Sequence, residues 1–195
     1  MLEPVAVVRP LLLDLLCKLA YRQGDFVLSS GQKSNYYINC KPVTLHPYGA
    51  LWTGQVILPL LLPHTQAVGG LTLGADPIVS AVSVVSALTN SPIPALIVRK
   101  QAKGHGTQAW IEGAELPPAS LVAVLEDVVT TGNSAMQAVE RLRTAGYQVK
   151  QVVALVDRLQ GAREFFAEQG LEFAAVFSIE ELHSHYPRVR GSALL

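Results

Sequence analysis

Five apolar runs of strand length, most of them separated by segments of helical periodicity, constrain the fold of this chain most. The runs are residues 66–70, 95–100, 121–127, 149–157 and 173–178. Apolar residues recur at helical spacing in segments between them: 76–88, 134–145 and 160–169. Strands without polar alternation are buried on both faces, and strands that alternate with helices form parallel sheets. We therefore expect an α/β fold with about five core strands flanked by helices.

The N-terminal part has a different pattern. Residues 4–22 have the apolar spacing of an amphipathic helix, and 46–62 also favour a helix. Between them, β-prone residues at 26–28 and 36–40 surround a turn rich in serine and glycine, which predicts a β-hairpin. The chain has no internal repeat, so we expect one domain over residues 1–195 with the hairpin as a small extra lobe.

Composition excludes several classes of protein. Half of the 195 residues are hydrophobic and 15% are charged, which excludes a disordered chain. Fifteen basic residues balance fifteen acidic ones, so we expect no nucleic-acid partner. Apolar stretches are too short or too interrupted for a membrane span, so we expect no membrane partner. Cys17 and Cys40 form no CxxC motif, and free thiols favour a cytoplasmic location.

The strongest chemical signal is the segment 121–134, LVAVLEDVVTTGNS. An apolar strand ends in Glu126 and Asp127, and a short polar loop leads into a helix. Ligands of open α/β sheets bind at the carboxyl ends of the strands. Backbone N–H groups, hydroxyls and a helix N-terminus suit a phosphate monoester. The two carboxylates repel phosphate, and they fit ribose hydroxyls or a Mg²⁺ ion bound there.

A second cluster, RKQAKGHG at 99–106, follows the strand at 95–100. It holds Arg99, Lys100, Lys103 and His105 beside two glycines. Several cationic donors beside a phosphate loop suit a diphosphate group. Glycines and prolines continue through this part of the chain, and we expect a flexible loop over about 101–118 that closes on the ligand.

These two segments, together with GDFVLSSGQKSNYYI at 24–38, VDR at 156–158 and QGA at 160–162, resemble the orotate phosphoribosyltransferase family of type I phosphoribosyltransferases. The resemblance runs from about residue 20 to 180. It implies a parallel-sheet type I phosphoribosyltransferase fold with a hood built from residues 20–45 and the C-terminal part. It also implies Mg²⁺ and a homodimer. The implied reaction transfers the phosphoribosyl group of phosphoribosyl diphosphate (PRPP) to orotate, giving orotidine 5′-monophosphate and pyrophosphate.

The resemblance also assigns roles to residues of this chain. The implied catalytic residues are Lys103, His105, Glu126 and Asp127, with Mg²⁺ carried by PRPP near the last two. The implied orotate-binding residues are Tyr37, Ile38, Thr130 and Arg158, the last for the carboxylate of orotate. The loop with Lys103 and His105, together with Arg99, is implied to serve a site shared with the partner subunit. The implied PRPP-binding residues are Arg99, Lys100, Lys103, His105, Glu126, Asp127, Val128, Val129, Thr130, Thr131, Gly132, Asn133 and Ser134.

Departures from the family pattern leave alternatives open. The family often has lysine where this chain has Ser29, and near Asp76; Lys33 or Lys41 could supply the missing charge. One alternative is a phosphoribosyltransferase for another base. Another is a non-catalytic regulator that senses PRPP, which the two substitutions favour and the balanced charge opposes. We interpret Arg141 as part of a solvated helix face.

Overall fold

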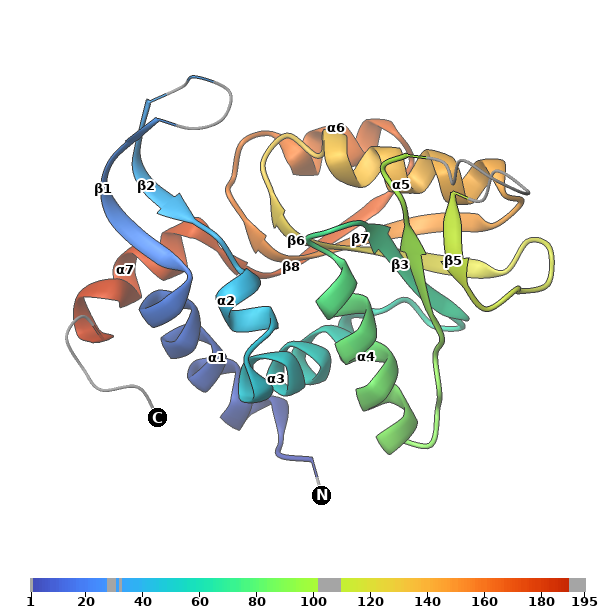
Figure 1. The fold of residues 1–195 in the computed structure, drawn as a ribbon, viewed down its shortest axis with the longest axis horizontal. Helices are drawn as coiled ribbons and strands as arrows, with labels where there is room; N and C mark the ends of the chain where they lie inside the picture. The colour runs from blue at the N-terminus through green and yellow to red at the C-terminus, as the bar shows by residue number, and fades with distance from the viewer. Residues whose placement is uncertain (1, 28–30, 32, 102–109, 190–195) are drawn as a thin grey trace.

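The computed structural model describes residues 2–27, 31, 33–101 and 110–189. Its centre is a six-stranded sheet in the order β5-β4-β3-β6-β7-β8 (Figure 1). All neighbouring strands are parallel except β5, which is antiparallel to β4. The strands are β3 (Ala67–Leu71), β4 (Ala95–Val98), β5 (Ile111–Gly113), β6 (Leu121–Val129), β7 (Gln148–Asp157) and β8 (Glu172–Ser178). The predicted α/β fold with five parallel core strands is confirmed.

Helices cover both faces of the sheet, as Figure 1 shows. One face carries α5 (Asn133–Thr144) and α6 (Ala162–Glu168). The other face carries α1 (Val5–Leu19), α3 (Pro47–Ile57) and α4 (Asp76–Leu88). A separate cluster of buried apolar side chains fills each interface, because the strands present valine, leucine and alanine on both sides.

A β-hairpin projects beyond the sheet at its upper left in Figure 1. It consists of β1 (Tyr21–Val27) and β2 (Lys33–Ile38), which pair antiparallel. Side chains alternate along β2, so that Tyr36 and Ile38 are half-buried while Tyr37 is exposed. The short helix α2 (Lys41–Thr44) leads from the hairpin to α3.

Several elements differ from the sequence prediction, among them the short helix α2, which was not predicted. Strand β5 lies inside the segment expected to be a loop, and its three residues are too few to show a period. Helix α7 (Ile179–Val189) was not predicted because its sequence is largely polar and contains Pro187. It packs against α1 through a narrow buried stripe that includes Leu182.

Two further predictions concern the environment of the chain. Both cysteines are free thiols, as expected, and both are buried. Among the helices of the described residues, none combines the length and the apolar character needed to cross a membrane.

The buried side chain of Gln151 on β7 connects the sheet to the segment that follows α3. Its Nε2 donates to the Leu60 carbonyl at 2.8 Å, and its Oε1 accepts from the Leu62 N–H at 3.0 Å. Gln151→Leu leaves both backbone groups unpaired, so we expect it to lower the free energy of unfolding by about 2 kcal/mol in urea denaturation. Gln148→Leu, at the exposed start of β7, is the control. Equal losses in the two variants would contradict the role of these hydrogen bonds.

Candidate active site

The candidate site lies at the carboxyl edge of the sheet, where β3, β6 and β7 end side by side. These neighbouring strands are parallel, so the segments that follow them meet at this edge. The Arg158 N–H donates to the Val129 carbonyl at 2.9 Å, which joins the residue after β7 to the end of β6. The segments with Thr130 and Arg158, both predicted to bind orotate, therefore adjoin.

The loop between β6 and α5 encloses a small cavity of about 50 Å³. Gly132 adopts a left-handed backbone with φ of +92°, and a Cβ there would lie 2.8 Å from the Phe166 ring. Both constraints require glycine at this position. Asn133 follows it as the first residue of α5. The cavity is lined by Glu126, Val128, Val129, Thr130, Thr131, Gly132, Asn133, Ser134 and Ala135.

This loop has the features of an anion site. The first N–H groups of α5 have no partner within the helix and point toward its N-terminal end. Thr131 and Ser134 add hydroxyl groups at exposed positions. The structure thus brings together the residues that the sequence predicted for a phosphate group.

The carboxyl group of Glu126 is buried, with 7% of the residue exposed. Its Oε2 atom has no hydrogen-bond partner within the described part of the chain. Burial above all, and the charge of the neighbouring Asp127 second, raise the pKa of Glu126 to about 8. The positive charge of Lys100 lowers the pKa and only partly offsets these effects. In the ligand-free protein at neutral pH, Glu126 is therefore mostly protonated.

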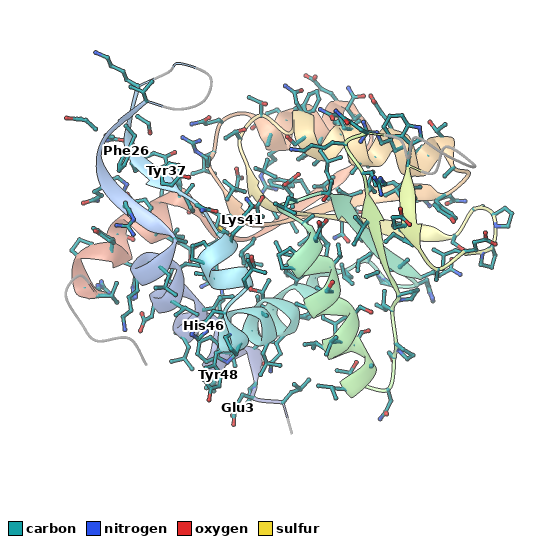
Figure 2. The ribbon with its side chains drawn as sticks, viewed as in Figure 1. Glu3, Phe26, Tyr37, Lys41, His46 and Tyr48 are labelled. Carbon is teal, nitrogen blue, oxygen red and sulfur yellow. The ribbon has the colours of Figure 1, made fainter. Side chains whose placement is uncertain are left out.

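The second carboxylate, Asp127, is surrounded by two other segments. Its Oδ2 lies 3.7 Å from the Lys41 ammonium at the start of α2, which Figure 2 labels. A Cβ on Gly74, in the turn after β3, would lie 2.6 Å from its Oδ1, so glycine lets the carboxylate keep this position. Lys41 and Lys33 are the two lysines that could supply the missing charge. Lys41 lies beside the acidic pair, Glu126 and Asp127. Lys33 lies at the exposed end of the hairpin.

Arg158 is in contact with the hairpin. Its Nε donates to the Tyr36 hydroxyl at 2.9 Å, and its guanidinium carbon lies 4.9 Å from the centre of the Tyr36 ring. Tyr37 lies on the other face of β2 beside Phe26, with 5.7 Å between ring centres (Figure 2). Ile38 shares the face of Tyr36. Sequence analysis missed Tyr36, although strand alternation places it opposite Tyr37.

The backbone of Arg99 and Lys100, directly after β4, is held by the side chain of Arg141 on α5. The Arg141 guanidinium donates to the carbonyls of Arg99 and Lys100 and stacks on Trp110, with 4.3 Å to the ring centre. The interpretation of Arg141 as a solvated residue was wrong, because sequence spacing cannot show that β4 ends beside α5. The Arg99 guanidinium pairs with Glu112 on β5 at 3.0 Å. Lys103, His105 and Ser29 lie outside the described residues.

Solved structures define the class of protein. A phosphoribosyltransferase from Corynebacterium diphtheriae has a TM-score of 0.79 and 36% identity, over 91% of this chain and 99% of that one. The orotate phosphoribosyltransferase of Mycobacterium tuberculosis in complex with PRPP has a TM-score of 0.76 and 34% identity, over 90% and 99% of the two chains. The fold is thus that of the phosphoribosyltransferases.

Curated sequences define the family. Orotate phosphoribosyltransferase from Nostoc sp. (strain PCC 7120) is 66% identical over 182 residues, 93% of this chain and 88% of the relative. That of Aquifex aeolicus is 43% identical, over 89% of this chain and 97% of the relative. No model of a known protein family matches the chain. On these similarities, the chain belongs to the orotate phosphoribosyltransferase family.

Membership of this family confirms the expected activity. The enzyme transfers the phosphoribosyl group of PRPP to orotate, giving orotidine 5′-monophosphate and pyrophosphate in pyrimidine biosynthesis. The same relatives oppose the two alternatives, another base or a non-catalytic regulator.

The raised pKa of Glu126 predicts a pH dependence of stability. Between the ordinary value of 4.5 and the folded value of about 8, the folded protein holds a proton that the unfolded chain releases. The stability that this proton confers is complete below pH 4.5 and is lost as pH rises through 8. Glu126→Gln stays neutral, so at about pH 9 we expect a Tm at least about 4 °C above wild type.

Well below pH 4.5 that difference in Tm should disappear, because both side chains are then neutral in the folded and in the unfolded state. Glu172→Gln, at the exposed start of β8, is the matched control and should not change the pH dependence. A difference in Tm that is the same at both pH values would refute the assignment to Glu126.

Proposed function

We propose that the carboxyl edge of the sheet binds PRPP along β6 and orotate between β7 and the hairpin. This placement of the two substrates is carried by one observation, the hydrogen bond from the Arg158 N–H to the Val129 carbonyl. Val129 is the last residue of β6, and the loop from Thr130 to Ser134 begins directly after it. Arg158 and Thr130 hold orotate, with Tyr37 and Ile38 of the hairpin near the base. Contact of Arg158 with the hairpin supports this placement.

In this proposal the groups of PRPP are shared among three segments. The loop from Thr130 to Ser134, with Val128 and Val129 before it, holds the 5-phosphate through N–H groups and hydroxyls. Glu126 and Asp127 hold the ribose hydroxyls. Arg99, Lys100, Lys103 and His105 hold the diphosphate, and the effect of Lys100 on the pKa of Glu126 supports a position close to the ribose.

The acidic pair also fits the Mg²⁺ ion that accompanies PRPP in this family. Mg²⁺ prefers oxygen ligands and usually keeps several waters, so one or two carboxylates suffice near it. The buried and unpartnered Oε2 of Glu126 supports such an interaction. The ion would be carried by PRPP beside this pair with no direct protein ligand, and when bound it would neutralise charge on the diphosphate.

Catalysis in this proposal is mainly electrostatic. The bond between ribose C1 and the diphosphate loosens first, which leaves positive charge on the ribose and negative charge on the leaving group. Lys103 stabilises the leaving group, with His105 beside it, and Asp127 holds the ribose end. Arg158 and Thr130 hold orotate N1 in line with C1, which lowers the entropic cost of the reaction.

We further propose that residues 1–195 act as one domain, with a hood formed by residues 20–45 and the C-terminal part. The enzyme is a cytoplasmic homodimer in this proposal. Its loop at about 101–118 reaches the site of the partner subunit. Large apolar side chains support a second copy at the α2–α4 side: Leu45 is 70% exposed, Leu73 66%, Val84 63% and Leu88 62%. The free cysteines support the location.

An orotate-dependent assay of pyrophosphate release with PRPP and Mg²⁺ tests the placement of the substrates. We expect Asp127→Asn to lower kcat/KM by about a hundredfold without loss of fold, because its charge serves ribose and Mg²⁺. Glu172→Gln, far from the site at the start of β8, should match wild type. Near-normal kcat/KM in Asp127→Asn would disprove the role of this carboxylate.

Mixed dimers test the shared loop. Lys103→Ala and Asp127→Asn are each expected to be nearly inactive alone. If the loop serves the partner's site, a mixed dimer has one site with both defects and one with none, so about a quarter of wild-type activity should return after random subunit exchange. Native mass spectrometry confirms the exchange. No recovery among verified mixed dimers would place the loop in its own subunit's site.

A further inference from the structure

The guanidinium of Arg158 has a defined orientation before any substrate binds. Its Nε donates to the Tyr36 hydroxyl at 2.9 Å, and its own N–H is bonded to the Val129 carbonyl at 2.9 Å. Within the described residues, neither terminal Nη atom has a hydrogen-bond partner. The two terminal nitrogens therefore remain available for a planar carboxylate, which an arginine fork binds through two parallel hydrogen bonds.

Tyr36 is itself held in place by the hood. Its ring stacks on Tyr21, with 5.9 Å between centres and 27° between planes. Tyr21 is 1% exposed, and its hydroxyl lies 2.7 Å from Nδ1 of His183 on α7. The His183 ring also meets Tyr36 edge-on, at 6.3 Å. Tyr36 thus rests on a packed layer of the protein, although its strand is at the surface.

A tyrosine hydroxyl has particular consequences as the partner of this arginine. It is a neutral acceptor, so it fixes the direction of the guanidinium without cancelling its charge. A carboxylate in its place would pair with Arg158 and repel an incoming anion. The Tyr36 hydroxyl therefore orients the Arg158 guanidinium toward an incoming anion and leaves the positive charge of the guanidinium unpaired.

We propose that Tyr36 is a positioning residue that orients Arg158 toward the carboxylate of orotate and so favours bases that carry a carboxylate. This inference rests on the proposed role of Arg158 in binding that carboxylate. Tyr36 acts through Arg158, so its effect depends on the presence of the carboxylate in the ligand.

Titration calorimetry with two nucleotides tests the inference. Orotidine 5′-monophosphate and uridine 5′-monophosphate differ only in the carboxylate of the base. Tyr36→Phe keeps the ring and removes the hydroxyl, so it should weaken orotidine 5′-monophosphate about fivefold, and the uridine nucleotide should be unaffected. Tyr147→Phe, after α5 and outside the hood, makes the same change and should alter neither affinity. In the forward reaction, KM for orotate should rise more than kcat falls.

A parallel variant separates failure of the inference from failure of the proposed site. Arg158→Met should weaken orotidine 5′-monophosphate more than Tyr36→Phe does, and adding Tyr36→Phe to it should cost nothing further. If Arg158→Met leaves this affinity unchanged, the proposed role of Arg158 is wrong. If Arg158→Met weakens binding while Tyr36→Phe does not, or if Tyr36→Phe weakens both nucleotides equally, the positioning role is overturned.

Discussion

The structure depends on the parallel pairing of β6 with strands on both of its sides. Val122 and Val124 of β6 are paired with Val149 and Val152 of β7, and β3 follows the other side in the same direction. Parallel pairing sends every chain segment after a strand to one edge, so residues far apart in sequence arrive together without any contact of their own. The loop after β6, the acidic pair of Glu126 and Asp127, and Arg158 all owe their proximity to this register.

Sequence reasoning succeeded where the physical signal is local. Buried strands, helix periodicity and a polar loop between them are visible within about ten residues, and the 121–134 segment was predicted on that basis. Partners across the sheet leave no such signal. Tyr36 and Arg158 are 122 positions apart, and Arg141 is 42 from Arg99, so their hydrogen bonds appear only when the fold is known. Strand β5 is too short to show any period.

The acidic pair shows how binding and folding compete at this edge. Two neighbouring carboxyl groups at the end of a buried strand are unfavourable for the isolated protein, as the raised pKa of Glu126 records. Lys41 and Lys100 offset the cost only in part. In the proposed mode of binding, the Mg²⁺ ion carried by PRPP would offset this repulsion, so part of the cost would be recovered when PRPP binds.

The close approach of Gly74 to Asp127 couples two distant parts of the chain. A Cβ at position 74 would lie 2.6 Å from Oδ1 of Asp127, so any larger residue there would displace the carboxylate. The turn after β3 therefore limits where the side chain at the end of β6 can lie, although 53 positions separate the two in the sequence. A substitution in this turn would act on the acidic pair as well as on the turn itself.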